Sequence, residues 1–427
     1  MERNIITSRQ TGDSCIHVKH SSGLDIYICE MAGYSTVEAL FGTKYGSINT
    51  MFKIAEDKDF TEVPEGIAHF LEHKLFENED CDVFELYAKT GASANAFTSF
   101  DKTCYLFSCS KNYRESLKIL LDFVQKPYFT KESVDKEQGI IGQEIKMCND
   151  NPEWRVFFNL LRGMYHNHPV KIDIAGTVES IAKIDADLLY KCYNTFYNLN
   201  NMALSIAGNI SADEVLEICD EALKPCEDKG LETVFPNEPS EIVESEIREN
   251  QPVGTPIFNI GFKCAPCDGR ERITKTVQAT LAAEVMTDVS SDMYQKLLKE
   301  QLINSTFGTE IFAGDGYFSV IFSGESSAPE KVRDAILSEI KRTCADGLNE
   351  SDFLRIKKST YGTLVRELNN VEAVANLMIN SHMCGTKPFD MIDILSQATS
   401  KQCLEFIKRE ITEDKLVMSV VEEAAKK

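Results

Sequence analysis

The sequence of 427 residues has no run of eighteen apolar residues, and its start, Met1-Glu2-Arg3-Asn4, has no basic segment that leads into an apolar stretch. A membrane-spanning helix needs the first pattern and a secretory signal needs the second. We therefore expect no membrane partner and a cytoplasmic location.

Basic residues are also scarce. The chain has 45 Lys and Arg against 67 Asp and Glu, which gives a formal net charge of -22. Such a charge repels phosphate backbones, so nucleic acid is not expected as a partner.

Regular cysteine spacing is missing as well, although the chain contains 14 cysteines. This favours reduced thiols over a disulfide scaffold. The pair Cys264 and Cys267 has the spacing of a metal or redox motif, but a single pair cannot complete a four-cysteine zinc site. Ordinary thiols after a strand are the simpler interpretation.

The length predicts more than one domain, since a single core rarely extends beyond about 250–300 residues. The stretch from Pro225 to Pro256 is rich in proline and acidic residues and has neither helical nor strand periodicity. We place a catalytic domain at 1–230, a linker at 231–254 and a second, metal-free domain at 255–427.

The two halves repeat an order of elements. The segment ALSIAGNISADEVLEI, from Ala203, resembles FSVIFSGESSAPEKVRDAI, from Phe318, and each reads as a strand, a glycine and a helix. A weaker echo pairs the helix start at Lys131 with that at Asn349. The chain is therefore predicted to be α+β, with two homologous halves that each consist of a sheet backed by helices.

Hydrophobic periodicity predicts the individual elements of the first half. Strands are expected between Cys15 and Lys53, in the stretch that begins at Gly91, and at Met202–Ala207. Helices are expected from Pro64 and at Val83–Lys89, Arg114–Gln125, Lys131–Met147, Trp154–Met164, Ala186–Phe196 and Ala212–Ala222.

The helix that begins near Pro64 contains the pattern His69-Phe70-Leu71-Glu72-His73. Residues four apart lie on one face of a helix, so His69 and His73 can bind one ion. Glu72 projects from nearly the same face and can take a proton from a water molecule held there. The pattern H-x-x-E-H is the signature of the inverted zinc peptidases. The alternative is a pair of surface histidines on an amphipathic helix.

A catalytic zinc ion usually has three protein ligands, so a third must come from elsewhere. The best candidate is Glu144, and Glu137 lies seven residues earlier on the same face of one predicted helix. Glu144 would bind the metal, while Glu137 would hydrogen-bond a histidine ring and fix its tautomer. Taken alone, these two acids would also fit a solvated helix face.

With this motif and the later glutamate, the sequence resembles the M16, or insulinase/pitrilysin, family of metallopeptidases. That family follows HxxEH with a glutamate ligand about seventy residues later, and Glu144 lies 71 residues after His73. The resemblance extends to GASANAFT, from Gly91 to Thr98, and to HPVKIDIAGTVESI, from His168. These segments look like a bacterial subgroup of smaller members named processing peptidases or proteins associated with elongation factor P modification.

The resemblance implies one zinc ion per chain and a substrate strand that pairs with Asn95 and Ala96 by strand addition. It also implies half of a clamshell, completed by a second chain. One departure concerns an Arg and a Tyr that the family uses to hold the substrate. The corresponding stretch, KLLKEQLINSTFGTE from Lys296, contains neither. A homo- or heterodimer with a metal-free M16 paralogue that supplies this pair is the natural inference.

The sequence thus predicts a zinc-dependent endopeptidase that hydrolyses peptides or unfolded segments in an enclosed chamber. Glu72 and Glu137 would serve catalysis, while His69, His73 and Glu144 would bind the metal. The first alternative is a non-hydrolytic peptide-binding or assembly subunit that retains the motif. The second is a hydrolase that acts on a non-peptide amide.

Overall fold

The computed structural model describes residues 2–79 and 82–424. The described chain forms two compact units, neither of which is continuous in sequence. The first unit contains the residues up to Ile145, together with Asp173–Phe235 and Leu364–Phe389. The second contains Lys146–Ile172, Pro236–Thr363 and the chain from Asp390 onward.

The first unit is organised around a seven-stranded sheet in the order β1-β2-β3-β9-β4-β8-β7. In that order the strands are Asn4–Thr7, Ser14–Lys19, Asp25–Glu30, Met202–Gly208, Val37–Thr43, Thr103–Cys109 and Ser93–Thr98. All pairs are antiparallel except β3 with β9. A smaller sheet in the order β10-β5-β6 joins Glu232–Thr233, Met51–Lys53 and Thr61–Glu62.

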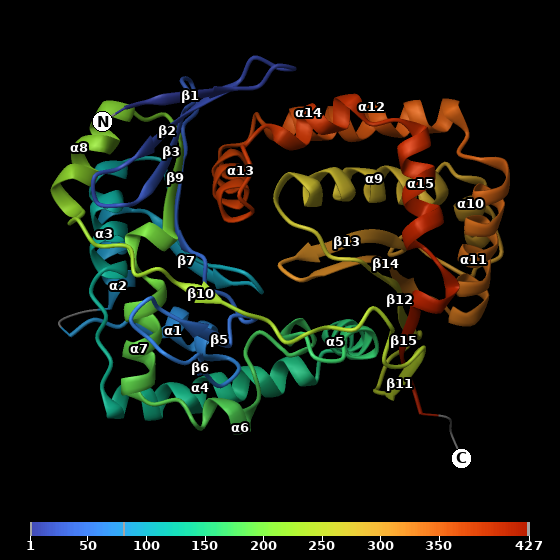
Figure 1. Ribbon diagram of the computed structural model, residues 1–427, viewed down its shortest axis with the longest axis horizontal. Helices are drawn as coiled ribbons and strands as arrows, with labels where there is room; N and C mark the ends of the chain where they lie inside the picture. Colours follow the sequence, from blue (N-terminus) through green and yellow to red (C-terminus); the bar gives the residue numbers. More distant parts are fainter. Residues whose placement is uncertain (1, 80–81, 425–427) are drawn as a thin grey trace. The chain divides into compact units, whose positions relative to one another are not determined.

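Helices cover both faces of the larger sheet. The helices that begin in this unit are Ile67–Leu75 (α1), Val83–Thr90 (α2), Tyr113–Val124 (α3), Lys131–Asn149 (α4), Val178–Ile181 (α6), Ala186–Phe196 (α7), Ala212–Ala222 (α8) and Val371–Met383 (α13). Strands β4 and β9 are buried along their whole length, since α3 lies on one side of the sheet and α13 on the other (Figure 1). This two-sided cover explains why both strands are mostly apolar in sequence.

The second unit contains a five-stranded sheet in the order β11-β15-β12-β14-β13. In that order the strands are Glu246–Asn250, Leu416–Glu422, Ile257–Cys264, Tyr317–Glu325 and Gly308–Gly314. Its helices are Pro152–Met164 (α5), Gly269–Thr287 (α9), Asp292–Lys299 (α10), Pro329–Asp346 (α11), Glu350–Glu367 (α12), Asp390–Gln397 (α14) and Ser400–Glu410 (α15). Short 3-10 turns occur at Pro169–Lys171 and Glu413–Lys415 in this unit and at Leu199–Asn201 in the first unit.

The predicted duplication is visible in these elements. The two similar sequence segments form β9–α8 and β14–α11, and the two similar helix starts open α4 and α12. The expectation of an α+β chain with two sheet-plus-helices halves is therefore confirmed.

The boundaries of the two units differ from those of the expected domains 1–230 and 255–427, because each unit is made of several separate segments of the chain. Helix α5 belongs to the second unit because it packs on β12 and β15, while α13 belongs to the first because it packs on β4 and β9. The fit of α13 is close at Gly42, where an added Cβ would lie 2.8 Å from Cys104 Sγ and 3.0 Å from Met383 Cε. The expected linker at 231–254 also has structure, since it supplies β10 and β11.

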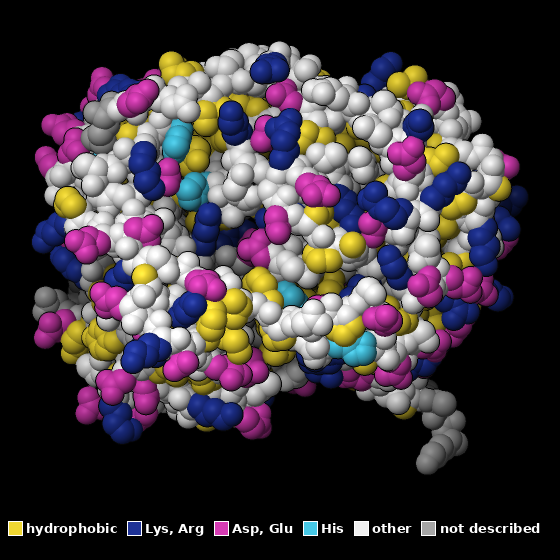
Figure 2. All heavy atoms as spheres, viewed as in Figure 1, with side chains coloured by type: hydrophobic (Ala, Val, Ile, Leu, Met, Phe, Trp, Pro, Cys, Tyr) yellow, Lys and Arg dark blue, Asp and Glu magenta, His cyan; other side chains and the backbone are white. Residues whose placement is uncertain are grey.

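Among the described residues, every helix is too short or too polar to cross a bilayer. Acidic and basic side chains are interspersed over the face drawn in Figure 2. The excess of negative charge is therefore not gathered into one patch on that face.

Candidate active site

Helix α1 places the predicted metal-binding motif, and a glycine determines where the helix begins. The sequence predicts a start near Pro64, but α1 begins at Ile67 because Gly66 adopts a left-handed conformation with φ 89°. A Cβ at Gly66 would also lie 2.3 Å from the carbonyl oxygen of Ala175. Gly66 is therefore required both by its own conformation and by this close approach.

The first turns of α1 bring His69 and His73 onto one face. Their ring centroids lie 4.5 Å apart. Nε2 of His69 lies 3.6 Å from Oε1 of Glu144, and Nε2 of His73 lies 3.6 Å from Oε2 of the same residue. These separations are too long for hydrogen bonds. Two ligands that each lie about 2.0 Å from a tetrahedral zinc ion are roughly 3.3 Å apart, so the spacing suits a shared ion.

One ligand atom from each of His69, His73 and Glu144 lies within 4.8 Å of the others. This is the single group of histidine, cysteine and acidic side chains in the described parts of the chain that meets such a criterion. The structure therefore brings together the three residues predicted as metal ligands. The donor set of two imidazoles and one carboxylate fits a catalytic zinc site, which has three protein ligands and one water molecule.

Glu137 lies on the far side of the His73 ring. Its Oε1 is 2.9 Å from Nδ1 of His73, while Nε2 of the same ring faces Glu144. A proton on Nδ1 leaves the lone pair of Nε2 free to bind a metal. His69 lacks this support, because its buried Nδ1 has no hydrogen-bond partner among the residues that the structure describes.

The pKa values of the two histidines are shifted in opposite directions. It lowers the pKa of His69 to about 3, with a smaller contribution from His73, so this ring is neutral near pH 7. Burial also acts to lower the pKa of His73, but the hydrogen bond to Glu137 and the nearby carboxylates outweigh it and raise this pKa. His69 is thus already in the form that a metal requires.

Glu72 lies beside the ligands but makes a different contact. The hydroxyl of Thr98 donates a hydrogen bond of 2.6 Å to Oε2 of Glu72. Burial raises the pKa of the Glu72 carboxyl, and the hydrogen bond from Thr98 opposes this shift. Thr98 was not among the predicted site residues, although it is the last position of the GASANAFT segment.

Asn95 and Ala96 lie on β7, the edge strand of the seven-stranded sheet. Strand β7 pairs with β8 alone among the described strands, so its other edge is open. The N–H of Ala96 donates to Oδ1 of Asn95 at 2.9 Å. Helix α1 contacts both β7 and β8, so the open edge belongs to the same part of the unit as the metal ligands.

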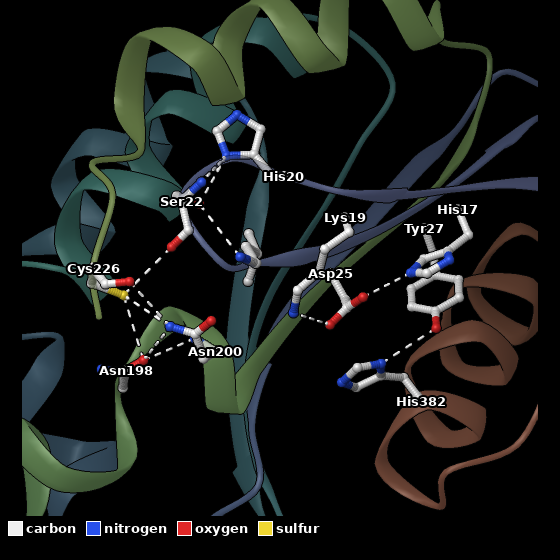
Figure 3. Close-up of polar contacts among 11 residues, drawn as sticks. His17, Lys19, His20, Ser22, Asp25, Tyr27, Asn198, Asn200, Cys226 and His382 are labelled. Carbon is white, nitrogen blue, oxygen red and sulfur yellow. Dashed lines mark hydrogen bonds and ion pairs between the residues drawn. The ribbon is translucent and has the colours of Figure 1, made fainter. Parts of the chain in front are cut away.

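Histidines outside this group have other contacts (Figure 3). Nε2 of His17 lies 2.8 Å from Oδ1 of Asp25, its ring stacks on Tyr27, and the Tyr27 hydroxyl lies 3.3 Å from Nδ1 of His382. These contacts join β2, β3 and α13 and account for two histidines to which the sequence analysis gave no role.

His20 forms an arrangement that superficially resembles a hydrolase triad. Its Nδ1 lies 2.8 Å from Oγ of Ser22 and its Nε2 lies 3.1 Å from Oδ1 of Asp220. Ser22 is fully buried, with 0% of its surface exposed. No substrate could reach its hydroxyl, so this group stabilises the turn between β2 and β3.

The segment that departs from the family pattern forms α10 and the approach to β13. Lys296 and Lys299 lie on α10, and Phe307 is buried with its ring near Phe258 and Tyr294. The position nearest to the expected tyrosine therefore holds a core residue without a hydroxyl group.

Comparison with known proteins identifies the family of the chain. The model described as "Insulinase (Peptidase family M16)" matches residues 60–178, and the model described as "Peptidase M16 inactive domain" matches residues 183–360. A Bacillus subtilis (strain 168) protein named zinc protease YmfH is 39% identical over 424 residues, which cover 97% of this chain and 98% of that protein. The chain belongs to the M16 family. Its relatives support a protease-like role.

Solved structures of the family show the same fold. An M16-like peptidase from Alicyclobacillus acidocaldarius matches with a TM-score of 0.92 and 32% identity over 99% of this chain and 98% of that chain. Pitrilysin matches with a TM-score of 0.76 and 14% identity over 98% of this chain and 46% of its own. The periplasmic protease PqqL from Escherichia coli gives a TM-score of 0.77 and 16% identity over 98% and 48%. The chain thus spans about half the length of these two larger proteins.

Proposed function

We propose that this protein is a zinc-dependent endopeptidase that hydrolyses peptides or unfolded polypeptide segments. The observation that carries the proposal is the grouping of His69, His73 and Glu144 around one point, with the carboxylate of Glu72 beside them. M16 relatives named zinc proteases support the choice of metal.

His69 and His73 would hold one zinc ion through Nε2, and Glu144 would hold it through a carboxylate oxygen. When bound, zinc would polarise the scissile carbonyl and lower the pKa of a water molecule to about 7. Glu137 would keep the proton of His73 on Nδ1. In this proposal Glu137 serves catalysis through His73, without touching the substrate.

Glu72 would act as the general base. Thr98 donates to the Glu72 carboxylate through its hydroxyl and its backbone N–H, and the lone pairs that remain can accept from the attacking water. Glu72 would accept a proton from this water as its oxygen bonds to the carbonyl carbon. It would then deliver the proton to the amine nitrogen as the C–N bond breaks.

The open edge of β7 would bind the substrate. An extended peptide can pair with this strand through main-chain hydrogen bonds near Asn95 and Ala96. Such pairing depends little on the side chains of the peptide. Because Oδ1 of Asn95 accepts from the N–H of Ala96, a pairing peptide would displace the Asn95 side chain. This mode selects extended chains and disfavours folded proteins.

A second M16 chain without a metal site is part of the proposal, so that an enclosed chamber forms from a homo- or heterodimer. Two observations support it. Pitrilysin and PqqL contain about twice the length matched here. The segment from Lys296 to Glu310 has neither Arg nor Tyr to hold the substrate. We also propose the cytoplasmic location, which the lack of regular cysteine spacing supports.

A non-hydrolytic peptide-binding subunit is the second candidate, and the burial of Phe307 where a tyrosine was expected favours it. The deciding experiment is a peptide-library cleavage assay with Glu72→Gln, which keeps the shape of the side chain and should retain zinc. We expect at least ~100-fold loss of turnover, as is usual for the removal of a general base. Equal cleavage by the wild type and the variant would contradict the role of Glu72. Peptide binding without cleavage by the wild type, with or without the partner, would support the alternative.

A further inference from the structure

The hydroxyl of Thr98 is directed at the proposed base by its own hydrogen-bond partners. It lies 2.6 Å from Oε2 of Glu72 and 3.3 Å from the hydroxyl oxygen of Thr103. Thr103 donates its proton to the carbonyl oxygen of Tyr45 at 2.8 Å. An ionised carboxylate only accepts, so the single proton of Thr98 points to Glu72.

The backbone holds Thr98 in place from two directions. Thr98 is paired with Thr103 at the closed end of the β7–β8 hairpin. The loop beyond it is bound by a neighbouring segment, because the N–H groups of Ser47 and Ile48 donate to the carbonyl oxygens of Ser99 and Phe100, each at 3.0 Å. The hairpin end that carries Thr98 is therefore anchored.

The approach between these segments is tight enough to limit movement. A Cβ added to Gly46 would lie 2.4 Å from the backbone of Phe100. Thr98 is also β-branched, which restricts its χ1 angle. Both features favour one position of the Thr98 hydroxyl, which is what a group that orients another side chain requires.

We propose that Thr98 is a positioning residue for the base. Its hydroxyl bond to Oε2, together with its backbone N–H, fixes the carboxylate plane of Glu72, and the lone pairs that remain on the carboxylate can accept from the reacting water. Because Thr98 lies on β7, the strand that carries Asn95 and Ala96, the base is held in register with a peptide paired to that strand. The catalytic part of this inference rests on the proposed function, whereas the geometric part does not.

The test compares Thr98→Val, which removes the hydroxyl and keeps the shape, with Thr98→Ser, which restores a hydroxyl. Thr61→Val is a matched control, since Thr61 is a partly buried strand residue whose hydroxyl contacts Lys191 instead. In the full chain with its partner, we expect Thr98→Val to lower kcat about tenfold or more with little change in KM, because small misplacements of a catalytic group are costly. Thr98→Ser should recover most of kcat. Zinc content and melting temperature should match those of Thr61→Val.

Crystal structures of the two Thr98 variants provide a second readout that needs no turnover. We expect the Glu72 carboxylate to rotate or become disordered in Thr98→Val and to keep its place in Thr98→Ser. An unchanged carboxylate in Thr98→Val, or an unchanged kcat where the wild type is active, would overturn the inference. If Glu72→Gln cleaves as well as the wild type, the proposed function fails instead, and the crystal structures still decide whether Thr98 positions Glu72.

Discussion

Glu137 and Glu144 contact opposite nitrogens of one ring, with Oε1 of Glu137 2.9 Å from Nδ1 of His73 and Oε2 of Glu144 3.6 Å from Nε2. One helix, α4, carries both carboxylates. The ring is therefore fixed from one side and free to bind a metal on the other.

This relationship predicts that Glu137→Gln weakens zinc binding without removing a ligand. Loss of such an outer partner typically costs about 10–100-fold in metal affinity. Competition with a chelator of known affinity measures the effect. Glu132→Gln, an exposed change in the first turn of the same helix, is the control and should leave affinity unchanged. Equal affinities for both variants would show that Glu137 has no role in the site.

The ligand set predicts one zinc ion per chain. Elemental analysis of the purified protein should give this ratio, and Glu144→Gln should lower zinc retention because a neutral amide is a weaker ligand than a carboxylate. The double variant His69→Ala, His73→Ala should retain none. Full zinc retention in that double variant would mean that the site lies elsewhere.

The segment without Arg and Tyr predicts that the chain alone is slow. Removal of one preorganised donor near a developing charge typically costs on the order of a hundredfold in rate. We expect at least a tenfold gain when a metal-free paralogue that bears this pair is added at fixed zinc. Full activity of the single chain, with no increase on mixing, would rule out a site divided between two chains.

A fourth prediction concerns Glu238, within the segment first interpreted as a linker. Its carboxylate accepts hydrogen bonds from the backbone N–H groups of His166, Asn167 and His168 and from Nζ of Lys263. Burial acts to raise the pKa of Glu238, but these hydrogen bonds outweigh it and lower the pKa to about 2.

Because the folded pKa lies below that of an unfolded glutamate, the stabilisation is fully present above pH ~4.5 and is lost as the pH falls towards about 2. We expect Glu238→Gln to lower the free energy of unfolding by on the order of 3 kcal/mol at pH 7. The difference from the wild type should shrink below pH ~4.5. Urea unfolding at several pH values measures this. Glu241→Gln, which keeps the backbone carbonyl that accepts from Lys263, is the control.

The parts of the site that could be predicted from sequence are those set by local periodicity. His69, Glu72 and His73 share one helix, and Glu137 and Glu144 share another, so their common faces follow from helical geometry. A hydrogen bond between Glu137 and one of the histidine rings was predicted, and in the structure the ring is that of His73. Which strand lies at the sheet edge is a matter of long-range pairing, and β7 was placed there only through the family resemblance.

Thr98 was missed because nothing in its own segment indicates a contact with Glu72, 26 residues away. It was also not predicted from the sequence that α5 belongs to the second unit and α13 to the first. Helix α5 is amphipathic, whereas α13 is apolar over most of its surface, and neither sequence indicates which sheet the helix covers, because that depends on the path of the chain. The boundaries of α7 and α8, by contrast, match the predicted ranges, because polar residues next to buried periodic faces mark their starts.

The late position of α13 in the sequence has a consequence during synthesis on the ribosome. The central strands of the first sheet are complete once Gly208 has been made, but the helix that covers one face of them ends at Met383. At about 5–20 residues per second, synthesis takes roughly 10–35 s to proceed from Gly208 to Met383, and during this time α13 does not yet cover that face. Nascent chains of intermediate length therefore expose the apolar face of β4 and β9, and this is the stage at which a chaperone would have most to bind.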